Sequence, residues 1–254
     1  MTRIIGVVSG KGGVGKTTTV ANLGTALASR FGRKVIAIDC NFTTSHLALH
    51  LDMYYTPITI NHLMRGSSKL EDSLYEHESG MMVLPASISF KDLYGLDFMK
   101  LKRIVGQMVG DADFILLDSA PGLGREAMAT LKASGELLFI TAPQAPSVMD
   151  LMRLKEVAGD SKVTGVVLSM CTGDSHEFRA AEIERISEMS VIAQIPFDKN
   201  VPRSIARRVP VVTYRPHSPA ARAYFALAAK LCNERYEGHH VVGRILSWIS
   251  DLMG

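Results

Sequence analysis

The sequence predicts an α/β protein with a doubly wound, mainly parallel sheet that is flanked by helices. Short β-rich runs alternate with longer helix-like stretches almost from end to end, which is the pattern of right-handed βαβ units sharing one sheet. Several strand-like runs, such as residues 4–8 and 114–117, are apolar throughout. Such runs are typical of parallel strands that are covered by helices on both faces.

The expected elements follow one another in order along the chain. Strands are expected at Arg3–Ser9, Lys34–Asp39, Met81–Leu84, Phe114–Asp118, Glu136–Thr141, Val163–Ser169 and Val191–Ile195. Helices are expected at Thr17–Phe31, Ile58–Arg65, Met99–Val109, Arg125–Lys132, Val148–Ala158, Glu177–Ser187 and Pro219–Asn233. We expect one domain over residues 1–235, followed at 236–254 by a polar joint and a C-terminal amphipathic helix.

Composition indicates a soluble globular protein. Of the 254 residues, 47% are hydrophobic and 21% are charged, as in globular domains. No apolar run reaches the length of about 18 residues that a transmembrane helix needs, and the N-terminus lacks the order of a secretory signal. The three cysteines are too few and too scattered for a disulfide framework or a spaced metal site. We therefore expect a cytoplasmic protein.

A phosphate-binding loop stands between the first expected strand and the first long helix. Residues 10–17 match the pattern G-x-x-x-x-G-K-[ST]. The glycines let backbone N–H groups surround a phosphate chain, and the following helix adds its positive dipole end. Lys16 would neutralise the β- and γ-phosphates, and Thr17 would offer its hydroxyl to Mg²⁺. The expected nucleotide-binding residues here are Gly10, Lys11, Gly12, Gly13, Val14, Gly15, Lys16, Thr17 and Thr18.

Two carboxylates end expected strands and complete this site. Asp39 closes the second strand and Asp118 a later one, so both face the sheet edge at which ligands bind in parallel α/β folds. A carboxylate there can hold Mg²⁺ through a water, and Gly122 permits the backbone to move with the γ-phosphate. Thr17, Asp39 and Asp118 are therefore the expected metal-site residues.

The run from Lys11 to Thr18 resembles the deviant Walker A motif of the MinD/ParA/NifH group of dimeric P-loop ATPases, with MinD-type cell-division ATPases the most similar. Residues 114–122 look like the Walker B strand and switch II of that group. The resemblance implies a P-loop NTPase fold that binds ATP and Mg²⁺ and converts ATP and water to ADP and phosphate. It also implies an ATP-dependent homodimer in which Lys11 reaches the partner's nucleotide.

Several positions depart from the MinD pattern. Asn41 stands where MinD-like proteins usually carry the second carboxylate of Asp-x-Asp, and an amide orients a water without accepting its proton. We therefore expect slow or partner-stimulated hydrolysis, with a binding-only switch as the alternative. Residues 195–198 resemble the loop near the adenine, so Pro196 and Asp198 are expected cofactor contacts, although Phe197 replaces an acid. Residues 169–171 stand where an Asn commonly helps to read the base.

The C-terminal stretch Val241–Met253 has an amphipathic pattern. Its apolar residues, Trp248 among them, recur at spacings of three and four, while polar residues take the other side. The stretch resembles the membrane-targeting helix of MinD. That resemblance implies reversible, peripheral association with the inner face of the cell membrane in the ATP state, to position a division site or polar structure. Packing on its own domain or on a partner chain are the alternatives.

A basic segment supports a second function. Residues 201–235 contain seven Lys and Arg residues against one acid, and ParA proteins, on the same fold, bind DNA without sequence preference. A solvated or internally paired face is the competing interpretation. No base-reading motif is evident, and the terminal stretch favours a membrane over DNA.

Overall fold

The computed structural model describes residues 1–236. The expected terminal helix at Val241–Met253 lies outside the described residues, so it stays a prediction, as does the division of the chain at residue 235. Within residues 1–236, no helix is both long and apolar enough to cross a bilayer.

The core of the fold is a sheet of eight strands with the order β3-β4-β2-β5-β1-β6-β7-β8. The pairings are parallel except that of β3 with β4. The strands are β1 (Arg3–Val8), β2 (Val35–Cys40), β3 (Tyr75–Glu76), β4 (Met82–Leu84), β5 (Phe114–Ser119), β6 (Glu136–Thr141), β7 (Val163–Cys171) and β8 (Val191–Pro196). This topology confirms the predicted fold class.

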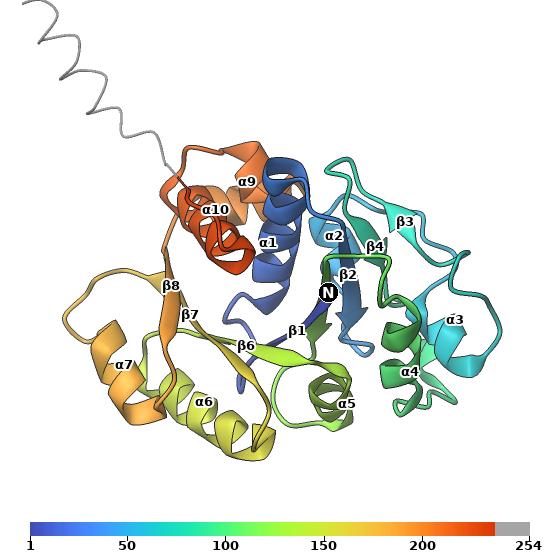
Figure 1. Cartoon of the computed structure of the whole chain (residues 1–254), viewed down its shortest axis with the longest axis horizontal. Helices are drawn as coiled ribbons and strands as arrows, with labels where there is room; N and C mark the ends of the chain where they lie inside the picture. The colour runs from blue at the N-terminus through green and yellow to red at the C-terminus, as the bar shows by residue number, and fades with distance from the viewer. Residues whose placement is uncertain (237–254) are drawn as a thin grey trace, which may run out of the picture.

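Helices cover both faces of the sheet, with α1, α9 and α10 on one side and α5, α6 and α7 on the other (Figure 1). The long helices are α1 (Lys16–Phe31), α4 (Lys100–Gln107), α5 (Arg125–Ala133), α6 (Ala145–Ala158), α7 (Ala180–Ser187) and α10 (Pro219–Cys232). The shorter ones are α2 (Leu47–His50), α3 (Ile60–Arg65), the 3₁₀ helix η1 (Phe90–Leu93), α8 (Asn200–Ala206) and α9 (Val211–Tyr214).

The two covered faces explain why the central strands are apolar throughout. In β2, Val35 and Ala37 belong to the core beneath α1 and α10. The alternate residues Ile36 and Ile38 belong to the core beneath α3, α4 and α5. Because neighbouring residues of a strand point to opposite faces, each face needs its own apolar set.

Local contacts shift some expected boundaries. The helix predicted from Glu177 begins at Ala180, because the Glu177 carboxylate instead accepts hydrogen bonds from the Thr172 and Gly173 N–H groups. Helix α6 begins earlier than predicted, at Ala145, because Pro146 fits the first turn of a helix. The short elements β3, α2, η1, α8 and α9 were not predicted.

Strand β1 lies at the centre of the sheet between β5 and β6. The chain leaves β1 toward β2 on one side and later fills the other side with β6, β7 and β8. Ligands of doubly wound folds bind at the carboxyl ends of the strands near such a reversal. The phosphate loop after β1 therefore occupies the position in which this fold binds ligands.

Candidate functional site

The phosphate loop connects β1 to α1 in a tight turn. Gly13 and Gly15 have φ angles of +79° and +90°, in the left-handed region that glycine adopts without strain. A Cβ atom on Gly10 would lie 2.2 Å from the carbonyl oxygen of Asp150 in α6, so only glycine fits there. The helical bonding of α1 starts with Thr19 N–H donating to Gly15 O. The first N–H groups of a helix are available to an anion.

Lys16 is held inside this loop. It is 7% exposed, and its Nζ donates to Ser9 Oγ at 2.8 Å, while Ser9 Oγ donates to Lys11 O at 2.6 Å. Burial lowers the pKa of Lys16, and the charge of Asp118 partly offsets that effect. Lys11, by contrast, is exposed on the same loop. The two lysines therefore occupy different environments, one buried beside the phosphate loop and one facing outward.

Asp118 carries the least compensated charge of the site. It is 1% exposed, and within residues 1–236 neither of its carboxylate oxygens accepts a hydrogen bond. Burial, followed by the charge of Asp39, raises the pKa of Asp118 to about 8, against the lowering effects of the nearby Thr17 hydroxyl and Lys16 ammonium. Buried polar groups without partners are costly and uncommon. The two oxygens beside a threonine hydroxyl fit Mg²⁺, which prefers oxygen ligands.

Asp39 lies directly opposite Asp118 in the β2–β5 register, but its oxygens are occupied. Oδ1 accepts from the Asn41 N–H at 3.0 Å, and Oδ2 accepts from Ser45 Oγ at 2.8 Å and from the N–H groups of His46 and Leu47 at 3.2 and 3.1 Å. Burial raises the pKa of Asp39, and these bonds oppose that effect. Asp39 thus holds the loop of residues 41–47, and its role toward a metal stays a prediction.

Asn41 is engaged within the same loop. Its Nδ2 donates to Thr44 O at 2.8 Å, and its Oδ1 accepts from Thr44 Oγ1 at 3.0 Å. The next residue but one, Thr43, donates its hydroxyl to Glu126 of α5. One N–H and the oxygen of the Asn41 amide are therefore bonded within the loop, and its predicted role toward an attacking water stays a prediction.

The loop after β5 is tied to the phosphate loop. Gly122 has a φ of +76°, and its N–H donates to Ser9 O at 3.1 Å. Ser9 also accepts from Lys16 through its hydroxyl. The structure thus places Gly122 beside the phosphate loop, and its predicted response to a γ-phosphate stays a prediction.

A cavity of about 260 Å³ opens beside the phosphate loop. It is lined by Gly13, Gly15, Thr18, Ser169, Met170, Ile195, Pro196, Phe197, Asp198, Val201, Pro202, Ile205 and Tyr224. The predicted residues Pro196 and Asp198 thus line the same cavity as the loop glycines Gly13 and Gly15, and their contact with a nucleotide stays a prediction. The wall that α8 contributes to this cavity was not predicted from the sequence. The pattern that could have indicated it is the apolar pair Val201 and Ile205, which lie four residues apart and so on one face of a helix.

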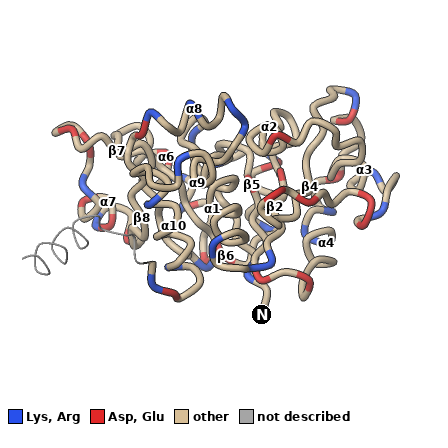
Figure 2. Tube along the Cα trace, turned by 90° about the horizontal axis from the view of Figure 1, so that it is seen from above, with Lys and Arg blue, Asp and Glu red and all other residues tan. Residues whose placement is uncertain are grey.

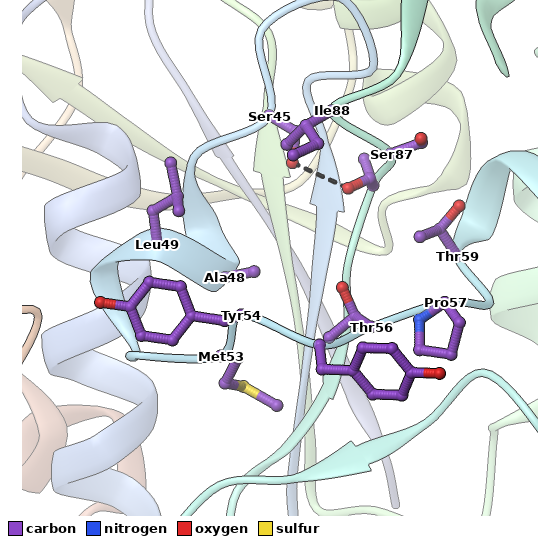
Figure 3. A pocket seen from close by; sticks show the side chains of 12 residues that line it. Ser45, Ala48, Leu49, Met53, Tyr54, Thr56, Pro57, Thr59, Ser87 and Ile88 are labelled. Carbon is purple, nitrogen blue, oxygen red and sulfur yellow. Dashed lines mark hydrogen bonds between the residues drawn. The ribbon is translucent and has the colours of Figure 1, made fainter. Parts of the chain in front are cut away.

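A second cavity, of about 280 Å³, lies on the other side of the site (Figure 3). Its walls come from the segments around Ser45, Tyr54 and Ile88. Ser45 Oγ donates to Ala86 O at 3.0 Å as well as to Asp39. The loop that Asp39 organises is therefore also joined to the segment after β4.

The basic segment 201–235 is partly engaged with aromatic rings. The guanidinium of Arg208 lies 4.1 Å from the centroid of Tyr54, and those of Arg207 and Arg215 lie 5.5 and 5.2 Å from that of Tyr214. Basic residues gather at and beside α8, while others are scattered over the molecule (Figure 2). Three of the seven basic side chains thus lie against aromatic rings, and Arg208 also forms an ion pair with Asp52.

Comparisons with known proteins identify the family. Residues 5–211 match the CobQ/CobB/MinD/ParA nucleotide binding domain. An ATP-binding protein of Methanocaldococcus jannaschii is 35% identical over 228 residues, which cover 89% of this chain and 86% of that protein.

Solved structures of MinD superpose on nearly the whole chain. The cell division ATPase MinD of Pyrococcus furiosus is 32% identical, with a TM-score of 0.88 and coverage of 92% of this chain and 99% of that one. MinD of Pyrococcus horikoshii, solved as a complex with Mg-ADP, is 32% identical, with a TM-score of 0.87 and coverage of 91% and 96%. The chain therefore belongs to the CobQ/CobB/MinD/ParA family of nucleotide-binding proteins, as a MinD/ParA-type P-loop ATPase.

Proposed function

We propose that this chain binds ATP with Mg²⁺ and that the bound nucleotide controls whether two copies pair. The observation that carries the proposal is the buried Asp118 carboxylate, which has no hydrogen-bond partner among the described residues and lies beside the phosphate loop with Lys16. A Mg²⁺–triphosphate complex supplies both the cation that Asp118 lacks and the anion that Lys16 and the start of α1 favour. The Mg-ADP bound to the P. horikoshii MinD supports the same ligand here.

Each residue of the site has a distinct role in this proposal. Lys16 and the loop N–H groups hold the β- and γ-phosphates, while Thr17 and Asp118 hold the metal, with Asp39 as a second carboxylate nearby. Mg²⁺ held by these residues would neutralise the negative charge of the triphosphate. Asn41 can orient a water but cannot take its proton. Hydrolysis is therefore slow, or it waits for an activating protein partner.

Pairing of two copies is supported by the sheet edge that carries the site. Lys11 is exposed there, and a cation that reaches a partner's triphosphate would link nucleotide state to dimerisation. Exposed apolar side chains follow three strands at this edge, namely Leu123, Met149 and Phe197, with exposures of 43, 57 and 56%. A second copy would cover them.

The cellular role follows by analogy with MinD, the cell division ATPase of P. furiosus. In the proposed cycle the ATP-bound dimer sits peripherally on the inner face of the cell membrane through Val241–Met253, and the ADP form is cytoplasmic. Two linked anchors bind more tightly than one because the second binds at a high effective concentration. Such a cycle positions a division site or a polar structure.

A ParA-like DNA-binding partition ATPase is the second candidate. The observation that favours it is the basic segment 201–235. Among the Lys and Arg side chains of this segment, only that of Arg208 forms an ion pair within residues 1–236. Guanidinium groups without carboxylate partners remain available to phosphates.

The metal role of Asp118 can be tested with Asp118→Asn. The pKa of about 8 in the folded protein exceeds the ordinary 3.8, so between these pH values the folded state keeps a proton that the unfolded chain releases. The free energy of unfolding of the ligand-free protein therefore falls as pH rises through this window. We expect Asp118→Asn to be more stable than wild type in urea at pH 8, by on the order of 1 kcal/mol, and to lose Mg²⁺-dependent ATP binding in calorimetry.

Asp111→Asn provides the control, because Asp111 is an exposed carboxylate before the opposite end of β5. It should alter neither property. Tight Mg-ATP binding by Asp118→Asn would contradict the assignment.

Pairing can be tested with Lys11→Ala by size-exclusion chromatography with light scattering. We expect wild-type protein to be a dimer with Mg²⁺ and ATPγS and a monomer with ADP. Lys11→Ala should remain a monomer in both, with ATP affinity within about threefold of wild type, because its ammonium serves the partner's nucleotide. Lys34→Ala, at an exposed lysine just before β2, should dimerise normally. A wild-type monomer with either nucleotide would remove the basis for ATP-controlled pairing.

The effect of Asn41 on hydrolysis can be tested by restoring a carboxylate. We expect Asn41→Asp to raise the single-turnover rate of phosphate release by about tenfold or more, because a carboxylate can accept the proton of the attacking water. Asn233→Asp, at the end of α10, is the control for the charge change. Equal rates for wild type and Asn41→Asp would defeat the hypothesis. Wild-type protein that binds ATP but releases no phosphate, with or without lipid, would be a binding-only switch.

The membrane anchor can be tested by sedimentation with anionic liposomes, ATP and Mg²⁺. We expect full-length protein to pellet and a chain ending at Gly238 to stay in solution. Trp248→Glu, in the apolar stripe, should also stay in solution, whereas Ser250→Glu, on the polar side of the pattern, should pellet. Unchanged pelleting of the truncated chain would exclude this anchor. Salt-sensitive, ATP-dependent retention on DNA would instead favour the ParA-like candidate.

A further inference from the structure

A groove of about 410 Å³ lies between the start of α4 and the exposed side of α5. The two helices lie side by side on one face of the sheet (Figure 1), and apolar residues of both belong to the same core. This α4–α5 groove shares no lining residue with the cavity beside the phosphate loop or with the cavity near Tyr54. It is therefore a separate feature of the surface.

The groove is lined mainly by apolar side chains, namely Leu96, Phe98, Met99, Leu123 and Met128. Met99 and Leu123 are 70 and 43% exposed, and the other three are half-buried. Apolar side chains that are exposed together in a hollow are typical of a surface that binds another molecule. Leu123 also belongs to the edge proposed for pairing, so the groove opens next to that edge.

The charged side chains of the groove are mostly cationic. Arg125 and Lys132 line it and are exposed, and neither forms an ion pair within residues 1–236. Asp97 is the one acid among the described residues that line the groove, and its Oδ1 accepts the Met99 N–H at 3.0 Å. The groove thus offers two cations that no carboxylate of the described chain neutralises.

The starts of both helices add to this positive charge. Met99 is the N-cap of α4, and Arg125 is the first residue of α5. A helix start carries a partial positive charge and favours acidic residues, yet the first turn of α4 holds no acid and carries Lys102 and Arg103. These two residues follow Met99 by three and four positions and so lie on the same helix face. Cations placed against a local preference are typical of a functional surface, and here they favour an anionic partner.

The chemistry of the groove distinguishes between its possible occupants. Two copies that met through this face would set cations against cations, because a two-fold interface joins the same patch to itself. The segment Val241–Met253 of this chain carries one Arg and one Asp, so it has no excess of acid. Nucleic acids contact proteins mainly through phosphates and would leave the apolar lining unused, and a lipid surface cannot enter a hollow. An acidic protein segment with apolar side chains matches both the charge and the lining.

We propose that the α4–α5 groove binds an acidic amphipathic helix of a protein partner. The groove is lined by helices and by the segments that precede them, without an open strand edge to which an extended peptide could add. Apolar side chains of the partner helix enter the groove, and its carboxylates pair with Arg125 and Lys132. The groove is present without nucleotide, so the proposal goes beyond the proposed function and does not depend on it.

Binding of a synthetic peptide tests the proposal with the full-length protein and no nucleotide. The probe is a fluorescein-labelled peptide of about 18 residues, long enough to form a helix, with leucine at helical spacing and glutamate and alanine elsewhere. A matched peptide carries lysine in place of each glutamate. In fluorescence anisotropy we expect the glutamate peptide to bind at least about tenfold more tightly, and to bind more weakly as salt is added. No binding of the glutamate peptide, or equal binding of the two, would overturn the proposal.

Arg125→Glu separates binding from folding. The helix dipole favours an acid at this position, so the variant should be at least as stable in urea as wild type. We expect it to bind the glutamate peptide about tenfold more weakly, because a cation has become an anion. Lys69→Glu, at an exposed lysine outside the groove, should bind like wild type. Unchanged binding by Arg125→Glu would count against the proposal decisively.

Met99→Ser examines the apolar part of the groove. Because Met99 is largely exposed, its loss should leave the fold intact and weaken the glutamate peptide by about fivefold or more. Val157→Ser, at a valine of α6 that is 41% exposed and outside the groove, should weaken it by less than about twofold. Self-association of the nucleotide-free wild type that Met99→Ser abolishes would place a second copy in the groove and refute the proposal.

Discussion

The burial of two carboxylates and one ammonium at the end of the central strands is the constraint on which the site depends. The β2–β5 register sets Asp39 opposite Asp118, and the turn into α1 adds Lys16. Burying a charge costs several kcal/mol unless it is paired and hydrogen-bonded. Clusters of buried ionisable groups with shifted pKa values are typical of functional sites, and here Lys16, Asp39 and Asp118 form such a cluster.

The two carboxylates meet this constraint in different ways. Four hydrogen bonds to Asp39 come from residues 41–47, so its charge is used to fix a loop. Asp118 receives none within residues 1–236, and its raised pKa expresses that deficit. The carboxylate at one strand end thus fixes a loop, whereas the carboxyl group at the neighbouring strand end has no hydrogen-bond partner among residues 1–236.

Much of the fold and part of the site could be predicted from the sequence, because short patterns of neighbouring residues mark the central strands and the phosphate loop. The central strands are apolar on both faces, and the phosphate loop is contiguous, so residues 10–18 and Asp118 could be named directly. Of the cavity beside the phosphate loop, Pro196 and Asp198 were named from the sequence, but its other walls were not, because it joins β7, β8, α8 and α10, which are distant in sequence. Ser169, for example, bonds a carbonyl 155 residues away. Helices of four to seven residues, such as α8 and α9, carry too short a pattern to recognise.

The contacts around the site also explain how its loops can act together. Gly122 bonds Ser9 beside the phosphate loop, and the chain enters α5 three residues later, where Glu126 accepts the Thr43 hydroxyl. Thr43 lies in the loop that Asp39 holds, and Asp39 faces Asp118. These contacts join the phosphate loop to the loop that carries Asn41 by way of α5. The Asn41 amide is bonded to Thr44 within that loop, so the position of its remaining N–H depends on the conformation that Asp39 and Glu126 hold.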